Sequence, residues 1–334
     1  MINAPSTSAN SDLLRLGSRL VWVLIAAMAC AVAAEYWAVG LTLDYGAVPV
    51  VALLIPICLA ASLLCYWCRL NHKLVYGTET VAQILLISFL GGLLTYGAAA
   101  AGFPYRDAEL LAADRWLGFD IKAYLAYLDA HPFLAALFPR VYLSIMRQPV
   151  IVVAALTLTG RLERLHDFSV ALIVSLIVTI AIFTLVPAIS WYAFLHIDGN
   201  AFPNLVIFTD FASHLDDVRA GGLHAISLAD LRGIIAFPSF HAAAAVLGAW
   251  AFWPIRFLRW PMLVLNALMV IATPIVGVHY LVDVIGGLAV GVGAVLAAGW
   301  VRRTLCRLHA VRDSETSATG ARVPDRGTIE AGAT

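Results

Sequence analysis

Eight long apolar runs dominate this sequence and leave few folds open to it; polar segments separate them, except that the last two follow each other directly. They cover residues 19–40, 47–67, 79–101, 139–160, 167–193, 237–254, 261–281 and 282–301. A helix needs roughly 20 apolar residues to cross the hydrocarbon core of a bilayer. Hydrophobic residues make up 62% of the chain and charged residues 13%, against about 25% charged residues in a soluble domain. We therefore expect an all-α, multi-span transmembrane helix bundle of about eight spans, with a range of six to eight.

The distribution of basic residues predicts the orientation of these spans, because cytoplasmic connections carry an excess of Lys and Arg. One side holds fourteen basic residues: Arg15, Arg19, Arg69, Lys73, Arg161, Arg164, Arg256, Arg259, Arg302, Arg303, Arg307, Arg312, Arg322 and Arg326. The other side clearly holds only five: Arg106, Arg115, Lys122, Arg219 and Arg232. We expect a multi-pass protein of the cell (inner) membrane with both termini in the cytoplasm.

Two long segments belong to the side with few basic residues, which this count places outside. Residues 102–138 carry Leu110, Ala113 and Leu117 on one helical face with charges flanking it, which predicts a helix lying in the membrane interface. Residues 194–236 mix polar and apolar residues. A loop of this length is either a lid over a functional site or an ordinary solvated loop.

The run Phe237-Pro-Ser-Phe-His241 stands at the start of an apolar segment. Proline is favoured in the first turn of a helix, so we expect a helix to begin here. The free backbone N–H groups and partial positive charge of a helix N-terminus form an anion site. Ser239 adds a hydroxyl donor and His241 a proton donor, a combination that suits a phosphate or another oxyanion.

The run Gly277-Val-His-Tyr-Leu-Val-Asp283 places His279 and Asp283 at positions i and i+4, so we expect them to share one helix face. A carboxylate in this position holds an imidazole in one tautomer and stabilises its protonated form. His279 follows His241 by 38 positions, which is about 57 Å of helix, or two crossings of the membrane core. A segment that goes down and returns brings the two histidines to one membrane face, the outer one.

Together, these two runs resemble the second and third signature motifs of the phosphatidic-acid phosphatase type 2 superfamily. The His-Tyr-x-x-Asp form is similar to the branch that contains inositol phosphorylceramide synthases and their bacterial relatives. The resemblance implies that His279 is the nucleophile that attacks phosphorus and that Asp283 orients it. It also implies that His241 protonates the leaving oxygen and then activates water or an acceptor hydroxyl, through a phosphohistidine and without a metal.

The sequence differs from the family pattern at the positions that bind the phosphate. Many members carry an arginine six residues before the nucleophile, but this position is Thr273. Arg140 and Arg147 match the first family motif only loosely. Arg147 is expected either to face the phosphate or to form a structural ion pair. Arg232 is a third candidate cation.

A metal site is the alternative use of His241, His279 and Asp283, since these are zinc-type ligands. The Pro-Ser pair at a helix start favours an anion instead. Cys65 and Cys68 form a C-x-x-C without the second pair that a zinc site needs. We expect no metal and no cofactor.

These inferences give a domain plan and a function. We expect a disordered N-terminus (1–18), three accessory spans (19–101), a phosphatase-like catalytic membrane domain (102–307) and a disordered cytoplasmic tail (308–334). The expected function is a membrane phosphatase acting on lipid or polyprenyl phosphates at the outer face. The alternatives are a lipid phosphotransferase with a hydroxyl acceptor and a non-catalytic lipid-phosphate binder or transporter. A net charge of zero gives no indication of nucleic-acid binding, and the oligomeric state stays open.

Overall fold

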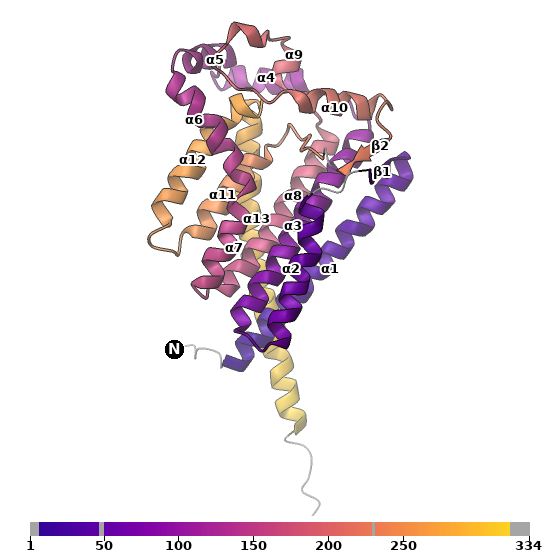
Figure 1. Ribbon diagram of the computed structural model, residues 1–334, viewed down its shortest axis with the longest axis vertical. Coiled ribbons are helices and arrows are strands. Elements are labelled where there is room, and N and C mark those ends of the chain that lie inside the picture. Colours follow the sequence, from indigo (N-terminus) through magenta and orange to yellow (C-terminus); the bar gives the residue numbers. More distant parts are fainter. Residues whose placement is uncertain (1–6, 47–49, 229–230, 321–334) are drawn as a thin grey trace, which may run out of the picture.

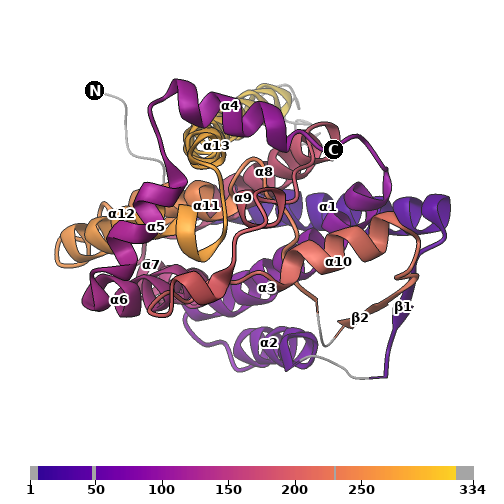
Figure 2. The same cartoon turned by 90° about the horizontal axis from the view of Figure 1, so that it is seen from above.

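The computed structural model describes residues 7–46, 50–228 and 231–320, and most of them are helical (Figure 1). A bundle of long helices carries a layer of short helices across one of its ends (Figures 1 and 2). The bundle contains α1 (Thr7–Val39), α2 (Val50–Trp67), α3 (His72–Ala100), α6 (Pro132–Tyr142), the 3-10 turn η1 (Leu143–Met146), α7 (Gln148–Leu158), α8 (Leu162–Leu185), α11 (Phe240–Phe252), α12 (Arg259–Val276) and α13 (Leu281–Gly320).

The end layer is built from the two long segments between the spans. It contains α4 (Asp107–Trp116), α5 (Ile121–Asp129), α9 (Trp191–Phe194), the 3-10 turn η2 (Gly199–Ala201) and α10 (Asp210–Arg219). Beside it, β1 (Thr42–Asp44) and β2 (Ala225–Ser227) form a parallel pair in which Thr42 faces Ala225. The described residues between 194 and 236 therefore form a structured cover and not one open loop.

The all-α bundle is confirmed, and the number of spans lies at the low end of the expected range rather than near eight. Within the described residues, five helices are long and apolar enough to cross a membrane: Asp12–Val39, His72–Ala100, Leu162–Leu185, Arg259–Val276 and Leu281–Val311. The pair α6–η1 and α7 makes a sixth if it is counted as one span. The other two predicted runs correspond to the shorter apolar helices Leu53–Trp67 and Phe240–Phe252. The 13 residues of α11 reach only about 20 Å, less than the roughly 30 Å hydrocarbon core.

The span predicted over residues 139–160 is broken in the middle. Its two halves, Pro132–Met146 and Gln148–Leu158, meet at an angle of 57°. Pro149 lies in the first turn of α7, where its ring is compatible with a helix start but not with an uninterrupted helix through Arg147. The break therefore follows from the local sequence.

Both ends are more helical than the expected disorder. α1 already begins at Thr7, and residues 1–6 lie outside the described part of the chain. At the other end, α13 continues past residue 308 to Gly320, because no Gly or Pro interrupts the sequence after Trp300 until that glycine. Residues 321–334 lie outside the described part.

The helix predicted in the membrane interface exists as α4, but its buried face is different. We expected an apolar face with Leu110, Ala113 and Leu117. Leu117 instead follows the helix end and is exposed, whereas Asp107 and Asp114 are buried together with Leu110. Because residues seven apart share one face of a helix, both carboxylates turn toward the bundle.

The small-residue pattern in α13 allows the close packing that we predicted. A Cβ atom on Gly287 would collide with the carbonyl oxygen of Ser239. One on Gly291 would lie 2.7 Å from the carbonyl oxygen of Ala243. The backbone of α13 thus lies directly against the first turns of α11.

Candidate active site

The runs that begin at Phe237 and Gly277 lie side by side, below the end layer, as the spacing of the histidines predicts. α11 leads away from that layer and α12 returns to it (Figure 1). The backbone N–H of Ser239 donates to the carbonyl oxygen of Asp283 at 2.9 Å. The first turns of α11 and α13 are therefore joined directly.

The expectation that His279 and Asp283 share a helix face is wrong in its local geometry. α12 ends at Val276 and α13 begins at Leu281, so His279 lies in the turn between them. The carboxylate of Asp283 reaches back from the first turn of α13. Its Oδ2 atom accepts from the backbone N–H of Tyr280 at 2.9 Å and lies 3.3 Å from Nδ1 of His279. This is a capping contact combined with a histidine contact, and it leaves Nε2 of His279 as the nitrogen for a reacting group.

His241 approaches the same place from α11, through an aromatic contact. Its imidazole stacks on the ring of Tyr142 from α6, with centroids 3.7 Å apart and planes 12° apart. Gly277 packs against both Tyr142 and His279, because a Cβ there would collide with the Tyr142 hydroxyl and lie 2.9 Å from Cδ2 of His279. Tyr142 therefore connects the two histidines.

The start of α11 has the free donors of an anion site. Ser239 is the N-cap, and its buried hydroxyl oxygen accepts from the backbone N–H of Ala242 at 3.4 Å. Among the described residues, nothing accepts from the backbone N–H groups of Phe240 and His241. The hydroxyl hydrogen of Ser239 and these two N–H groups can serve an oxyanion beside the imidazole of His241.

Two carboxylates of α4, which the sequence did not reveal as site residues, accept hydrogen bonds from the residues that follow His279. Asp114 of α4 accepts from the backbone N–H groups of Leu281 and Val282, both at 2.8 Å. It thus caps α13 from a different helix. The spacing of Asp107 and Asp114 puts them on one face of α4, but spacing alone does not say that this face turns inward.

Asp107 ties the same turn to the rest of the end layer. Its carboxylate accepts from the hydroxyl of Tyr280 at 2.9 Å and from the backbone N–H groups of Ile189 and Ser190, both at 3.0 Å. Tyr280 follows His279 in sequence, so its hydroxyl bond fixes the residue next to the imidazole.

Burial in the end layer affects the protonation of both carboxyl groups. It raises the pKa of Asp107, and the hydrogen bonds from Ile189, Tyr280 and Ser190 oppose the rise. It also raises the pKa of Asp114 against the opposing hydrogen bonds from Leu281 and Val282. The pKa of the Tyr280 hydroxyl is raised, first by burial and then by the charge of Asp107. Tyr280 therefore stays a hydrogen-bond donor to Asp107.

The three arginines that we expected at the phosphate lie on separate parts of the chain: α6, the break before α7 and the segment before α11. Arg140 is exposed and donates to the carbonyl of Ala136 at 2.8 Å. It lies about 200° around α6 from Tyr142, hence on the other face. Arg147 is exposed at the break before α7. Arg232 is half-buried in the extended segment before Phe237, where its backbone N–H donates to the Tyr96 hydroxyl at 3.2 Å.

Thr273 does not replace the missing arginine. Its side chain is fully buried in α12, and its hydroxyl donates to the carbonyl of Met269 at 2.7 Å. The described residues also contain no group of three or more His, Cys, Asp or Glu side chains arranged to hold a metal ion. The contacts at the site are thus histidine, carboxylate and backbone contacts.

Comparison with known proteins gives one match. The family model described as the PAP2 superfamily matches residues 108–297, which is more than half of the chain and includes both histidine runs and α4 from its second residue onward. No curated protein and no solved structure matches the chain.

Proposed function

Because this chain belongs to the PAP2 superfamily, we propose that it is an integral membrane phosphatase that acts on lipid or polyprenyl phosphates through a phosphohistidine at His279. The observation that carries this proposal is the buried His279–Asp283 pair beside His241, at the free N-terminus of α11. A histidine whose Nδ1 faces a carboxylate and whose Nε2 is left over has the arrangement of an activated nucleophile.

The first chemical step transfers the phosphoryl group to the protein. Nε2 of His279 forms a bond to phosphorus while the bond from phosphorus to the leaving oxygen breaks. Asp283 stabilises the positive charge that develops on the imidazole, and a protonated His241 gives its proton to the leaving oxygen.

The second step releases the phosphate. His241 has lost its proton and now takes one from water, whose oxygen bonds to phosphorus as the bond to Nε2 of His279 breaks. The backbone N–H groups of Phe240 and His241 and the Ser239 hydroxyl hold the phosphate oxygens, in place of the arginine absent at Thr273. Arg232, the half-buried one of the three candidate arginines, is the cation we retain for this role.

A lipid substrate follows from where the site lies along the bundle. Candidate span Leu281–Val311 starts two residues after His279, and span Arg259–Val276 ends three residues before it. A reacting group at the end of a span is at the level of lipid headgroups. The basic-residue count supports an orientation with this end at the outer face of the cell membrane and both termini in the cytoplasm.

A hydroxyl compound in place of water would make the protein a phosphotransferase, similar to inositol phosphorylceramide synthases. Thr273 and the His279-Tyr-x-x-Asp283 form favour this second function. The chemistry at His279 and His241 is the same in both, and only the acceptor in the second step differs.

A product assay on the purified protein tests the proposal and separates its alternatives. A panel of lipid and polyprenyl phosphates is incubated with and without inositol-like or glycerol-like acceptors. We expect free phosphate or a new phosphoester, and neither with His279→Ala. Substrate binding without any product, or full turnover by His279→Ala, would contradict the proposal and favour a binder or transporter.

A further inference from the structure

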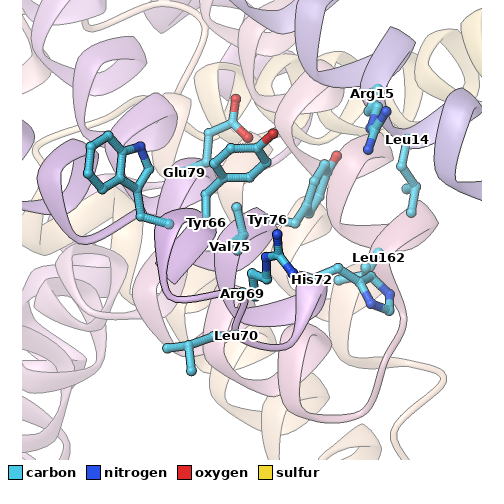
Figure 3. Close-up of a pocket in the computed structure, with 11 residues that line it drawn as sticks. Leu14, Arg15, Tyr66, Arg69, Leu70, His72, Val75, Tyr76, Glu79 and Leu162 are labelled. Carbon is cyan, nitrogen blue, oxygen red and sulfur yellow. The ribbon is translucent and has the colours of Figure 1, made fainter. Parts of the chain in front are cut away.

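A cavity of about 680 Å³ opens at the end of the bundle opposite to the histidines. It lies among the start of α1, the end of α2 with the turn after it, the start of α3 and Leu162 (Figures 1 and 3). Three candidate spans, Asp12–Val39, His72–Ala100 and Leu162–Leu185, begin beside it. The cavity is thus at the headgroup level of the other leaflet, and its volume is typical of ligand sites.

Three basic side chains from separate elements line this cavity: Arg15 of α1, Arg69 of the turn after α2, and His72 of α3. Figure 3 shows the ring of Tyr76 between Arg15 and Arg69. No carboxylate or other acceptor in the described part of the chain pairs with these three side chains. The two guanidinium charges of Arg15 and Arg69 therefore face the cavity without a paired carboxylate in the described part of the chain.

The backbone conformation of Arg69 is a second, independent feature of this cavity. Its φ angle is 52°, in the left-handed region that favours glycine. The turn between α2 and α3 thus keeps an arginine where a glycine would be less strained. Strain of this kind is typical of residues retained for a function.

The inner wall of the cavity contains a carboxylate and aromatic rings. Glu79 of α3 accepts from the Ser18 hydroxyl at 2.6 Å and from Nε1 of Trp22 at 2.7 Å, both at its Oε1 atom. Its Oε2 atom is left for a hydroxyl or ammonium group of a ligand. Tyr66 and Tyr76 supply ring faces, as aromatic residues do at the membrane–water interface.

From these features we infer that the cavity binds the headgroup of an anionic phospholipid from the leaflet opposite to the candidate active site. Arg15 and Arg69 bind the phosphate, His72 supports them, and Glu79 with the aromatic rings contacts the polar end of the headgroup. Basic pockets between membrane helices are a known physical solution for holding anionic headgroups. This site does not depend on the reaction at His279.

Native mass spectrometry of the full-length protein in detergent tests the inference, with dioctanoyl phosphatidylglycerol as the probe. Three variants are compared with wild type: Arg15→Ala/Arg69→Ala, Arg69→Gly and Lys73→Ala. Lys73 is the matched control, because it is basic and next to His72 but its ammonium packs against Gly160 outside the cavity. We expect at least about tenfold weaker binding for Arg15→Ala/Arg69→Ala, since charged hydrogen bonds to phosphate are lost. Lys73→Ala should bind like wild type.

Arg69→Gly separates binding from folding. Glycine suits the φ angle at this position, so the thermal midpoint should not fall, while binding of phosphatidylglycerol weakens. Equal binding by wild type and Arg15→Ala/Arg69→Ala overturns the inference. So does equal binding of dioctanoyl phosphatidylcholine, or displacement of the lipid by inorganic phosphate at an equal concentration, since either removes the anionic headgroup as the ligand.

Discussion

The backbone N–H of Ser239 donates to the carbonyl oxygen of Asp283 at 2.9 Å, and this bond joins the two helix starts that frame the histidines. It is possible only because Gly287 lets the backbone of α13 approach Ser239. The relative position of His241 and His279 therefore depends on backbone packing as well as on their own side-chain contacts.

Gly287→Ala should separate the two helix starts. The added Cβ meets the Ser239 carbonyl, a backbone atom that cannot move alone, so we expect a loss of about 1–3 kcal/mol of unfolding free energy and at least tenfold lower kcat. Gly293→Ala is the control on the same helix, because nothing lies within 4 Å of its Cβ position. It should leave activity unchanged and stabilise the helix by up to about 1 kcal/mol. Equal effects of the two substitutions would contradict this role of Gly287.

Asp283→Asn tests the charge opposite Nδ1 of His279. Asparagine has the same shape and keeps an acceptor for the Tyr280 N–H, while Oδ1 of Asp283 has no partner that the amide would displace. We expect a thermal midpoint close to wild type and kcat lowered by about a hundredfold or more, because the imidazole loses its orienting charge. Turnover near the wild-type rate, measured under saturating substrate, would show that Asp283 is only structural.

Asp114→Ala should lower activity because it displaces the turn that contains His279. The substitution leaves the backbone N–H groups of Leu281 and Val282 without their carboxylate, at a cost of about 2 kcal/mol or more. Asp120→Ala is matched, because Asp120 also accepts from two backbone N–H groups, but at the start of α5. Both variants should be less stable, and only Asp114→Ala should lose kcat at a temperature where both remain folded. Comparable kcat values for the two would remove the positioning role.

Asp107 predicts a dependence of stability on pH. Its pKa is raised in the folded protein, so the folded state holds this proton more tightly than the unfolded chain. The group favours folding most below about pH 4 and loses that contribution as the pH rises through its folded-state pKa. The unfolding free energy of wild type minus that of Asp107→Asn should therefore decrease between about pH 4 and neutral pH and then level off. A difference that is constant with pH, in chemical unfolding of both proteins, would contradict the raised pKa.

The sequence predicts those parts of the structure that follow from the spacing of apolar residues and from the length of the apolar runs. The helical runs, and the meeting of His241 with His279 after two passes, follow from apolar patterning and the rise of a helix. The inward carboxylates of α4 could not be predicted in the same way, because a charge on an amphipathic helix is ordinarily assigned to its solvated face. Only the tertiary structure shows that Asp114 finds the free N–H groups of α13.

The turn that contains His279 is a second feature that could not be predicted from the sequence. The spacing of four residues suited a helical pair, but Val278 has a φ angle of 51° and ends the helical conformation before the histidine. Arg140 and Arg147 match a motif by spacing, but the 3-10 turn η1 lies between them and the helix breaks at Arg147, so they do not belong to one regular helix. Local backbone geometry of this kind leaves little trace in hydrophobic patterning.

Trapping the covalent intermediate tests the central claim most directly. Wild type, His279→Ala and His241→Ala are mixed with lipid phosphate labelled at phosphorus, quenched within one turnover and digested for peptide mapping. We predict alkali-stable, acid-labile label on the peptide with His279 in wild type, longer-lived label there in His241→Ala, where water is not activated, and none in His279→Ala. Product formation by wild type without labelled protein at any quench time, or label on His241, would contradict the mechanism.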